Sequence, residues 1–287
     1  WHNDPVSDSS GEALYLRDEE TGDVWSPTPL PVRGKGDYLT RHGFGYSTFE
    51  HTEYGISSTL TVFVAEEAPV RLSLLTLSNL SGKTRNLSIT GYVEWVLGEL
   101  ASRSARHVVT SPAAIATGSA VLARNFYNST GSARTAFFAV TGTRIAYSGN
   151  RLECLGRNGT TRQPAMMNVR GLSGNTGAGM DPCAALQTLT TLIDGDSRSF
   201  VFALGVGEDE GAVTALMQQF LSTGEAQNEL TKVKQHWHQL LTKVQIQTPA
   251  TEVDLLANGW LLYQTLASRL LARSGYYQSG GAFGFRD

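Results

Sequence analysis

The feature that most constrains the fold is one change in the period of the hydrophobic residues. From residue 12 to about residue 206, apolar and polar residues alternate with a period of two, as in residues 70–77. After residue 207 the apolar residues recur at intervals of three and four, as in residues 208–221. A period of two marks one face of a strand, and the longer period marks one face of a helix. The chain is therefore predicted to form a β-domain first and helices afterwards.

The β-domain is predicted to be an antiparallel sandwich. Short strands at regular intervals, separated by turn signals, are typical of that architecture. Tyr54-Gly55 separates two strand candidates and predicts a hairpin turn. Thirty glycines against nine prolines fit many tight turns. The strand candidates are residues 48–53, 57–64, 70–77, 86–95, 118–124, 134–141, 144–148, 185–193 and 199–206.

Three helices are predicted after the sandwich. Residues 208–221 and 225–241 each carry one apolar stripe, which suits linker helices that cover a surface. A short strand is expected at residues 244–247, and Thr248-Pro249 then opens a third helix. The predicted division is a β-domain at 1–206 that lacks its opening strands, a helical linker at 207–248 and the truncated start of a second domain at 249–287.

The third helix differs from the other two because it is apolar around most of its circumference. Val253, Trp260 and Tyr263 belong to its main stripe, and Leu255 and Leu262 widen it. Such a helix is expected to be buried on several sides. Since nothing else in the chain could bury it, we expect its partners in a larger helical domain beyond residue 287. The start at Trp1 without a Met also suggests a piece of a longer protein.

Composition excludes several classes of function. A net charge of −3 and a pI near 6.1 argue against nucleic acid as a partner, because phosphate binding requires concentrated positive charge. There is no uninterrupted apolar run of the roughly 20 residues that a bilayer span needs, so we expect a soluble chain. Cys154 and Cys183 stand outside any CxxC or Cys/His cluster, so they are expected to be buried thiols and no metal site is predicted.

Most local motifs have an ordinary structural interpretation. His236 and His238 are two apart on a helix and point in different directions, so solvated histidines are favoured over a ligand pair. Glu94-Trp95 could stack on a sugar, but a core aromatic is favoured. The glycine-rich residues 171–179 lack the strand and helix that a phosphate-binding loop requires, and are predicted to be an ordinary loop.

The strongest local signal is the C-terminal run from Ser274 to Asp287. It holds four glycines, four aromatic residues, one Gln and an adjacent Arg-Asp. Aromatic rings with planar hydrogen-bonding groups suit a sugar, which has apolar ring faces and hydroxyl edges. A structural glycine loop is the alternative, and the residues alone do not decide between them.

This run resembles the loop that opens the catalytic barrel of glycoside hydrolase family 94, the cellobiose-phosphorylase-like family. The resemblance spans essentially the whole chain, and within the family it is greatest to the C-terminal region of the cyclic β-1,2-glucan synthases. The motifs that carry it are Asn3-Asp4-Pro5-Val6-Ser7-Asp8, Tyr15-Leu16-Arg17-Asp18, Trp25-Ser26-Pro27, Arg41-His42-Gly43, Gly91-Tyr92-Val93-Glu94-Trp95, Ala123-Arg124-Asn125, Gly156-Arg157-Asn158-Gly159, Asp181-Pro182-Cys183, Asn258-Gly259-Trp260 and Gly280-Gly281-Ala282-Phe283-Gly284-Phe285-Arg286-Asp287.

The resemblance implies a mainly β fold: an antiparallel β-supersandwich, linker helices and the first helix of an incomplete (α/α)6 barrel. It implies a parent enzyme that cleaves a β-glucosidic bond with inorganic phosphate and inversion, giving a sugar 1-phosphate, or runs the reverse reaction. It assigns Arg286, and less directly Asp287, to the donor-glucose subsite. The catalytic Asp of the family and its phosphate-binding residues lie after this motif, so the piece is expected to hold no catalytic residue and to be inactive.

The same resemblance implies β-glucan and phosphate as partners, and no organic cofactor. It implies a bacterial origin and is compatible with a parent in the inner membrane that holds this region in the cytoplasm. The alternative hypothesis is a non-catalytic module that binds carbohydrate or forms a homodimer through the β-domain. A third reading, a mutarotase-like epimerase, shares the sandwich but is disfavoured by the helical tail.

Overall fold

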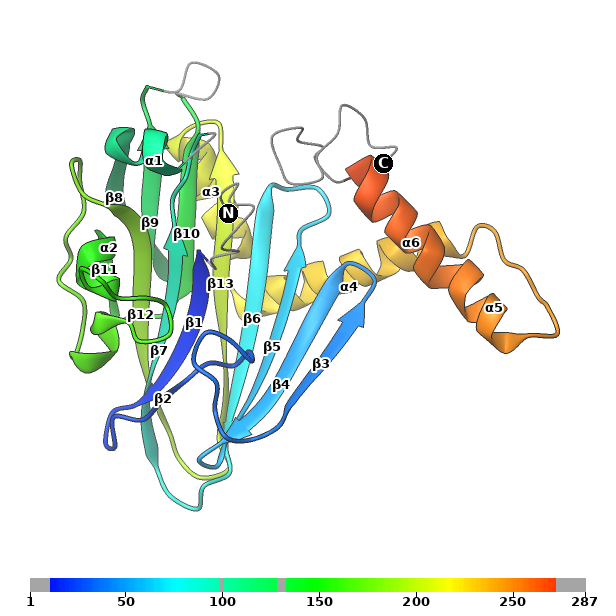
Figure 1. Cartoon of the computed structure of the whole chain (residues 1–287), viewed down its shortest axis with the longest axis horizontal. Coiled ribbons are helices and arrows are strands. Elements are labelled where there is room, and N and C mark those ends of the chain that lie inside the picture. Colours follow the sequence, from blue (N-terminus) through cyan, green and yellow to red (C-terminus); the bar gives the residue numbers. More distant parts are fainter. Residues whose placement is uncertain (1–10, 99–100, 128–132, 272–287) are drawn as a thin grey trace.

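The fold is built on two antiparallel β-sheets that face each other. The computed structural model describes residues 11–98, 101–127 and 133–271 (Figure 1). One sheet has five strands, in the order β11 (Ile145–Asn150), β12 (Pro182–Leu192), β7 (Arg85–Glu94), β1 (Glu12–Asp18) and β2 (Val24–Trp25). The other has eight, in the order β3 (Tyr38–Gly43), β4 (Tyr46–Glu53), β5 (Ile56–Val64), β6 (Val70–Asn79), β13 (Ser197–Gly207), β10 (Thr135–Thr141), β9 (Gly118–Asn125) and β8 (Val108–Ile115).

The predicted strands are confirmed as β4 to β7 and β9 to β13, and the sandwich architecture is confirmed with them. Strands β1, β2, β3 and β8 come in addition. The hairpin turn at Tyr54-Gly55 is also confirmed. Both residues have positive φ, +49° and +78°, as a type I′ turn requires.

The main core fills the space between the two sheets. Leu16, Ile89 and Leu186 enter it from the five-stranded sheet and are fully buried. Phe138 and Phe202 enter it from the eight-stranded sheet, with ring centroids 5.8 Å apart. The same cluster includes Trp95, which is 6% exposed, so the core interpretation of Glu94-Trp95 is confirmed.

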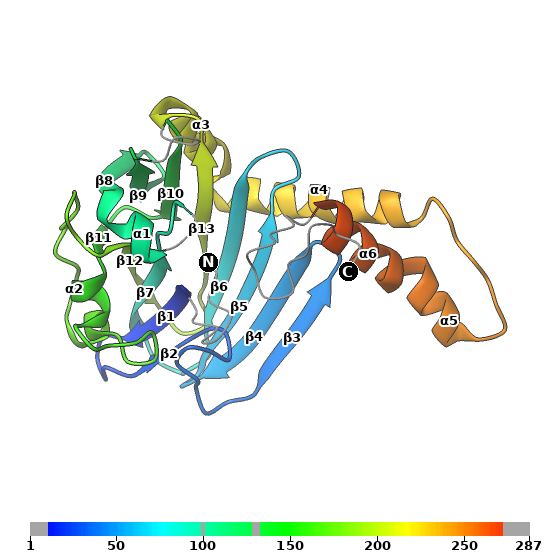
Figure 2. The same cartoon turned by 45° about the horizontal axis from the view of Figure 1, so that its top comes forward.

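The outer face of the eight-stranded sheet is apolar too, and two helices cover it (Figures 1 and 2). Helix α3 (Glu210–Phe220) begins at Asp209, which accepts a hydrogen bond from the Ala212 N–H, and α4 (Thr223–Leu241) begins at Ser222, which caps the Glu225 N–H. Both predicted linker helices are thus confirmed. Their apolar stripes pack on outward side chains of the sheet, and the members include Leu72, Phe137, Val201, Val213, Met217, Phe220, Val233 and Trp237.

The outer face of the five-stranded sheet is covered only in part. Helix α2 (Arg151–Leu155) and the 3-10 helix η2 (Ala165–Asn168) lie over it. Cys154 and Cys183 are free and buried there, with sulfur atoms 3.8 Å apart, which confirms the predicted buried thiols. Burial raises the pKa of the Cys183 thiol well above its ordinary value. A short helix α1 (Ala101–Ser104) and the 3-10 helix η1 (Ala105–His107) precede β8.

The third predicted helix is present and runs without interruption from Thr251 to Leu271. It consists of α5 (Thr251–Leu255), the π-helical turn η3 (Leu256–Trp260), α6 (Leu261–Thr265) and a second π-helical turn η4 (Leu266–Leu271). Leu255 is 75% exposed and Leu261 51% exposed within the described residues, so the burial of these sides by a domain beyond residue 287 stays a prediction. One side alone packs on the rest of the described chain.

The strand expected at residues 244–247 is wrong. The segment pairs with no strand within the described residues. Its backbone is held instead by one side chain from the following helix. The Ile246 N–H donates to Asn258 Oδ1 at 2.7 Å, and Asn258 Nδ2 donates to the Ile246 carbonyl at 2.8 Å. No helix within the described residues combines the length and apolarity that a bilayer crossing requires.

A buried ion pair ties the first hairpin to the sandwich. Asp18, at the end of β1, is 1% exposed, and Arg85, at the start of β7, is 4% exposed. Arg85 Nε donates to Asp18 Oδ2 at 2.7 Å, and Arg85 Nη1 donates to the Tyr54 carbonyl at 2.6 Å. The other Asp18 oxygen accepts from the backbone N–H groups of Glu20 and Thr21. The acidic run at residues 18–20 therefore leads into a turn, and its first carboxylate is structural.

Asp18→Asn is expected to destabilise the protein by about 3 kcal/mol, because it leaves Arg85 buried without its counter-charge. Burial alone would raise the pKa of Asp18, but the Thr21 N–H, Arg85 and the Glu20 N–H together hold that pKa below its ordinary value. Because this pKa is lowered in the folded protein, ionised Asp18 contributes its full stabilisation above the unfolded-state pKa of about 3.9. That contribution is lost as the pH falls through the folded-state pKa. The difference in free energy of unfolding between wild type and Asp18→Asn should therefore become smaller in acid.

Urea unfolding at neutral pH and at several pH values below 5 measures this difference. Glu50→Gln is the matched control, since Glu50 pairs with Arg41 on the surface, where such a pair contributes less than about 1 kcal/mol. Equal losses in the two variants would contradict the role given to Asp18.

Candidate functional site

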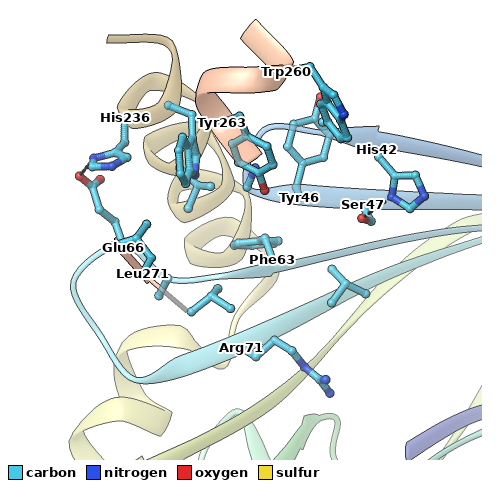
Figure 3. Close-up of a pocket in the computed structure, with 17 residues that line it drawn as sticks. His42, Tyr46, Ser47, Phe63, Glu66, Arg71, His236, Trp260, Tyr263 and Leu271 are labelled. Carbon is cyan, nitrogen blue, oxygen red and sulfur yellow. Dashed lines mark hydrogen bonds and ion pairs between the residues drawn. The ribbon is translucent and has the colours of Figure 1, made fainter. Parts of the chain in front are cut away.

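A large hollow lies where the sandwich, α4 and the last helix meet (Figure 3). It has a volume of about 850 Å³. One wall comes from β3 to β6, another from α4, and the third from the helix that ends at Leu271. We call this hollow the junction groove, and its lining residues are His42, Gly43, Gly45, Tyr46, Ser47, Val62, Phe63, Val64, Ala65, Glu66, Arg71, Val233, His236, Trp237, Trp260, Tyr263 and Leu271.

The tip of the β3–β4 hairpin holds the groove together. Phe44 and Gly45 are its two turn residues, and Gly45 has φ +81°. The Gly45 N–H donates to the hydroxyl oxygen of Tyr263 at 3.1 Å. On the other side Gly45 presses on Trp237, because a Cβ at this position would lie 2.4 Å from Trp237 Nε1. The turn therefore touches α4 and the last helix at once.

Aromatic rings form the apolar part of the groove. Trp237 and Tyr263 meet edge to face with centroids 4.5 Å apart. Phe44 is outside the lining and supports it, with its ring centroid 5.1 Å from that of Tyr263 and 6.1 Å from that of Trp260. Gly259 allows this approach, since a Cβ there would come within 2.9 Å of the Phe44 ring. Such pairs add about 0.5–1.5 kcal/mol each beyond the area that they bury.

Polar groups around these rings are hydrogen-bonded or paired with one another. His42 and Ser47 share a hydrogen bond of 2.8 Å, and His236 Nδ1 lies 2.7 Å from Glu66 Oε1 (Figure 3). His236 is thus paired with a carboxylate across the groove and does not form a ligand pair with His238. Arg71 forms an ion pair with Glu12. These groups can hydrogen-bond a polar ligand or another part of the protein.

The groove does not have the composition of a hydrolytic centre. Glu66 is the one carboxylate among the described residues that line it, whereas glycoside cleavage uses two groups on opposite sides of the bond. No group of three or more His, Cys, Asp or Glu side chains in the described part of the chain is placed to hold a metal ion. The described lining of the groove therefore offers no pair of carboxylates for cleavage of a glycosidic bond.

The site residues predicted from the sequence, Arg286 and Asp287, lie outside the described residues. Sequence reasoning did not single out Phe44 or Trp237 as site residues. A usable signal was present in the run His42-Gly43-Phe44-Gly45-Tyr46, where glycines alternate with aromatics. Such a run predicts a tight turn that carries exposed rings.

Comparison with protein families gives two matches in order along the chain. Residues 1–223 match the supersandwich domain of glycosyl hydrolase 94, and residues 236–287 match the catalytic domain of the glycosyl hydrolase 94 superfamily. The chain belongs to glycoside hydrolase family 94. The junction groove is thus lined by residues from both family 94 domains: His42 to Arg71 from the first match, and His236 to Leu271 from the second.

Three curated relatives illustrate the family 94 similarity. The chain is 37% identical to a cyclic beta-(1,2)-glucan synthase of Rhizobium meliloti, with all of this chain and 10% of the relative covered. It is 31% identical to an N,N'-diacetylchitobiose phosphorylase of Vibrio furnissii, with 98% and 36% covered. It is 28% identical to a solabiose phosphorylase of Paenibacillus borealis, with 96% and 35% covered. The chain thus spans about a third of these phosphorylases and a tenth of the synthase.

Gly45→Ala is expected to destabilise the protein more than Gly82→Ala. Both glycines have nearly the same positive φ, +81° and +77°, which costs an alanine about 1 kcal/mol or more. A Cβ at Gly82 meets nothing within 4 Å, whereas a Cβ at Gly45 strikes Trp237 and Val233. Overpacking of this kind adds about 1–3 kcal/mol.

Urea unfolding followed by tryptophan fluorescence measures both free energies of unfolding. The fluorescence of native Gly45→Ala should also differ from wild type, because Trp237 must move. If the two alanine variants lost the same stability, the hairpin tip would not clamp α4.

Proposed function

We propose that this chain is part of an inverting glycoside phosphorylase that acts on β-glucan, β-1,2-linked glucan in particular. The observation that carries the proposal is the ordered pair of family matches, a supersandwich followed by the start of a catalytic domain. The names of the relatives support the reaction type, since two of the three reported above are phosphorylases. The identity of 37% with a cyclic beta-(1,2)-glucan synthase supports the linkage.

The chemistry follows from the inverting reaction. A phosphate oxygen forms a bond to the anomeric carbon while the glucosidic carbon–oxygen bond breaks on the opposite face. A general acid gives its proton to the departing oxygen, and the products are α-glucose 1-phosphate and a shortened glucan. Inorganic phosphate is the co-substrate, and the scheme requires no organic cofactor. None of the described residues is assigned as general acid or phosphate ligand.

In this proposal the described residues position the start of the catalytic domain. In the proposed division, residues 1–206 form the β-domain, 207–248 the linker, and 249–287 the start of the catalytic domain. The β3–β4 hairpin fixes Tyr263, on the helix that precedes Arg286 and Asp287 in the sequence. Arg286 is proposed to bind hydroxyl groups of the donor glucose, and Asp287 to assist it.

Two further expectations stay predictions under this proposal. The parent is taken to be a bacterial protein, with an inner-membrane location and a cytoplasmic position for this region. A homodimer formed through the β-domain is tested by light scattering of the purified chain. Neither is required for the phosphorylase reaction.

Arg286→Ala in the full-length protein is expected to lower kcat/KM for phosphorolysis of β-1,2-glucan by about 10- to 100-fold. A charged hydrogen bond to a substrate contributes about 1.5–3 kcal/mol, and each 1.4 kcal/mol is a factor of ten. Release of glucose 1-phosphate from glucan and phosphate is the measurement. Arg286→Lys, the matched variant, should recover part of the loss because it keeps the charge without the planar fork.

Unchanged turnover in Arg286→Ala would refute the donor-site assignment. Absence of glucose 1-phosphate formation by the wild-type full-length protein, with β-1,2-, β-1,3- and β-1,4-linked glucans all tried, would refute the phosphorylase proposal itself.

A further inference from the structure

A second hollow, separate from the junction groove, opens on the outer face of the five-stranded sheet. It has a volume of about 410 Å³ and spans β11, β12, β7 and the turn between β1 and β2. We call it the sheet pocket. Ligand pockets commonly measure about 300–1,000 Å³, so this one suits a ligand of mono- or disaccharide size.

Strand register explains why the pocket lies at this place. Ala146 of β11, Gln187 of β12, Thr90 of β7 and Tyr15 of β1 lie opposite one another in one row across the sheet. Toward α2 the outward-facing residues are apolar and covered, as at Tyr92 and Ala185. From Gln187 onward polar side chains such as Asn86 appear beside Leu189, and the pocket is lined there by the loop residues Arg170 and Gly171.

The floor of the pocket offers an incompletely used amide. Gln187 is 3% exposed, and its Nε2 donates to Thr90 Oγ1 at 3.2 Å. Within the described residues this is its only hydrogen bond, so the carbonyl oxygen and one N–H remain for a ligand. The Gln187 carbonyl oxygen is not among the described buried polar atoms that lack a partner, so it reaches the open space of the pocket, where a bound polar molecule can donate to it.

The walls carry balanced charge. Glu19 accepts a hydrogen bond from Ser88 at 2.7 Å and lies within ion-pair distance of Arg17 and Arg170. Two charged lining residues remain to contact a ligand. Arg144 has no ion pair within the described residues, and the Glu20 carboxylate accepts a 3.4 Å hydrogen bond from Asn86. One positive and one negative group are therefore available, so the pocket favours neither an anion nor a cation.

The ligand chemistry follows from this set of groups. A guanidinium donates, a carboxylate accepts, and an amide does both, which matches adjacent hydroxyl groups that are donors and acceptors together. Leu189, 54% exposed, gives an apolar surface beside them for the carbon–hydrogen face of a ring. We propose that the sheet pocket binds a neutral saccharide through Gln187, Arg144 and Glu20.

The test measures saccharide binding to the 287-residue chain by saturation-transfer NMR and by titration. The probes are glucose and the β-1,2-linked disaccharide sophorose, with glucose 1-phosphate and inorganic phosphate as charged comparisons. Only the choice of a β-1,2-linked probe rests on the proposed function. Because the readout involves no turnover, it stands whether or not the full-length protein is a phosphorylase.

We expect saturable binding of a neutral sugar that weakens about tenfold or more in Arg144→Ala and in Gln187→Leu. Arg134→Ala is the matched control, because Arg134 is an exposed arginine that pairs with Glu208 beside the eight-stranded sheet. This variant should bind the sugar as wild type does. Arg144 is exposed, so its variant keeps the test valid even if Gln187→Leu fails to fold.

Three results would overturn the proposal. The first is absence of neutral-sugar binding by the wild-type chain. The second is binding that survives unchanged in Arg144→Ala. The third is tighter binding of inorganic phosphate or glucose 1-phosphate than of either neutral sugar, which would make the pocket an anion site.

Discussion

The structure depends on one constraint: the eight-stranded sheet is apolar on both faces. In β10, for example, Phe138 points into the sandwich while its neighbour Phe137 points outward, and both are buried. In β13 Phe202 and Val201 divide in the same way. Both faces of such a sheet need a covering layer, because an apolar surface left in water forgoes a stabilisation of about 25 cal/mol per Å². The five-stranded sheet covers one face, and α3 and α4 cover the other.

The position of the junction groove follows from that second cover. Once α4 lies on the outer face, Trp237 comes to rest beside the tip of the β3–β4 hairpin, and Gly45 is the residue that fits against it. The same turn then offers its N–H to Tyr263 and its Phe44 ring to Trp260, which orients the last helix. The residue that starts this chain of contacts is a small one, since any side chain at position 45 would separate α4 from the hairpin.

Much of the fold could be predicted because the local periodicity of hydrophobic residues indicates its strands and helices. The central strands and the two linker helices have strong patterns, and the Tyr54-Gly55 turn has a specific dipeptide. Failures came where a non-local contact decided the structure. Residues 244–247 alternate like a strand but are held by Asn258, and the Asp18–Arg85 pair joins residues far apart in sequence. Neither hollow could be predicted, because each is bounded by segments that only the fold brings together.

The two hollows differ in chemistry because the two sheets are covered differently. Over the eight-stranded sheet the cover is long and continuous, so the hollow at its end is lined by rings that would otherwise be core, such as Trp237 and Phe63. Over the five-stranded sheet the cover stops after α2 and η2, and the strands respond with Gln187, Thr90 and Ser88 where they would otherwise need apolar residues. Such polar rows need hydrogen bonds, and the Gln187 amide makes one within the described protein, to Thr90. A saccharide in the sheet pocket supplies the further hydrogen bonds that this amide can make.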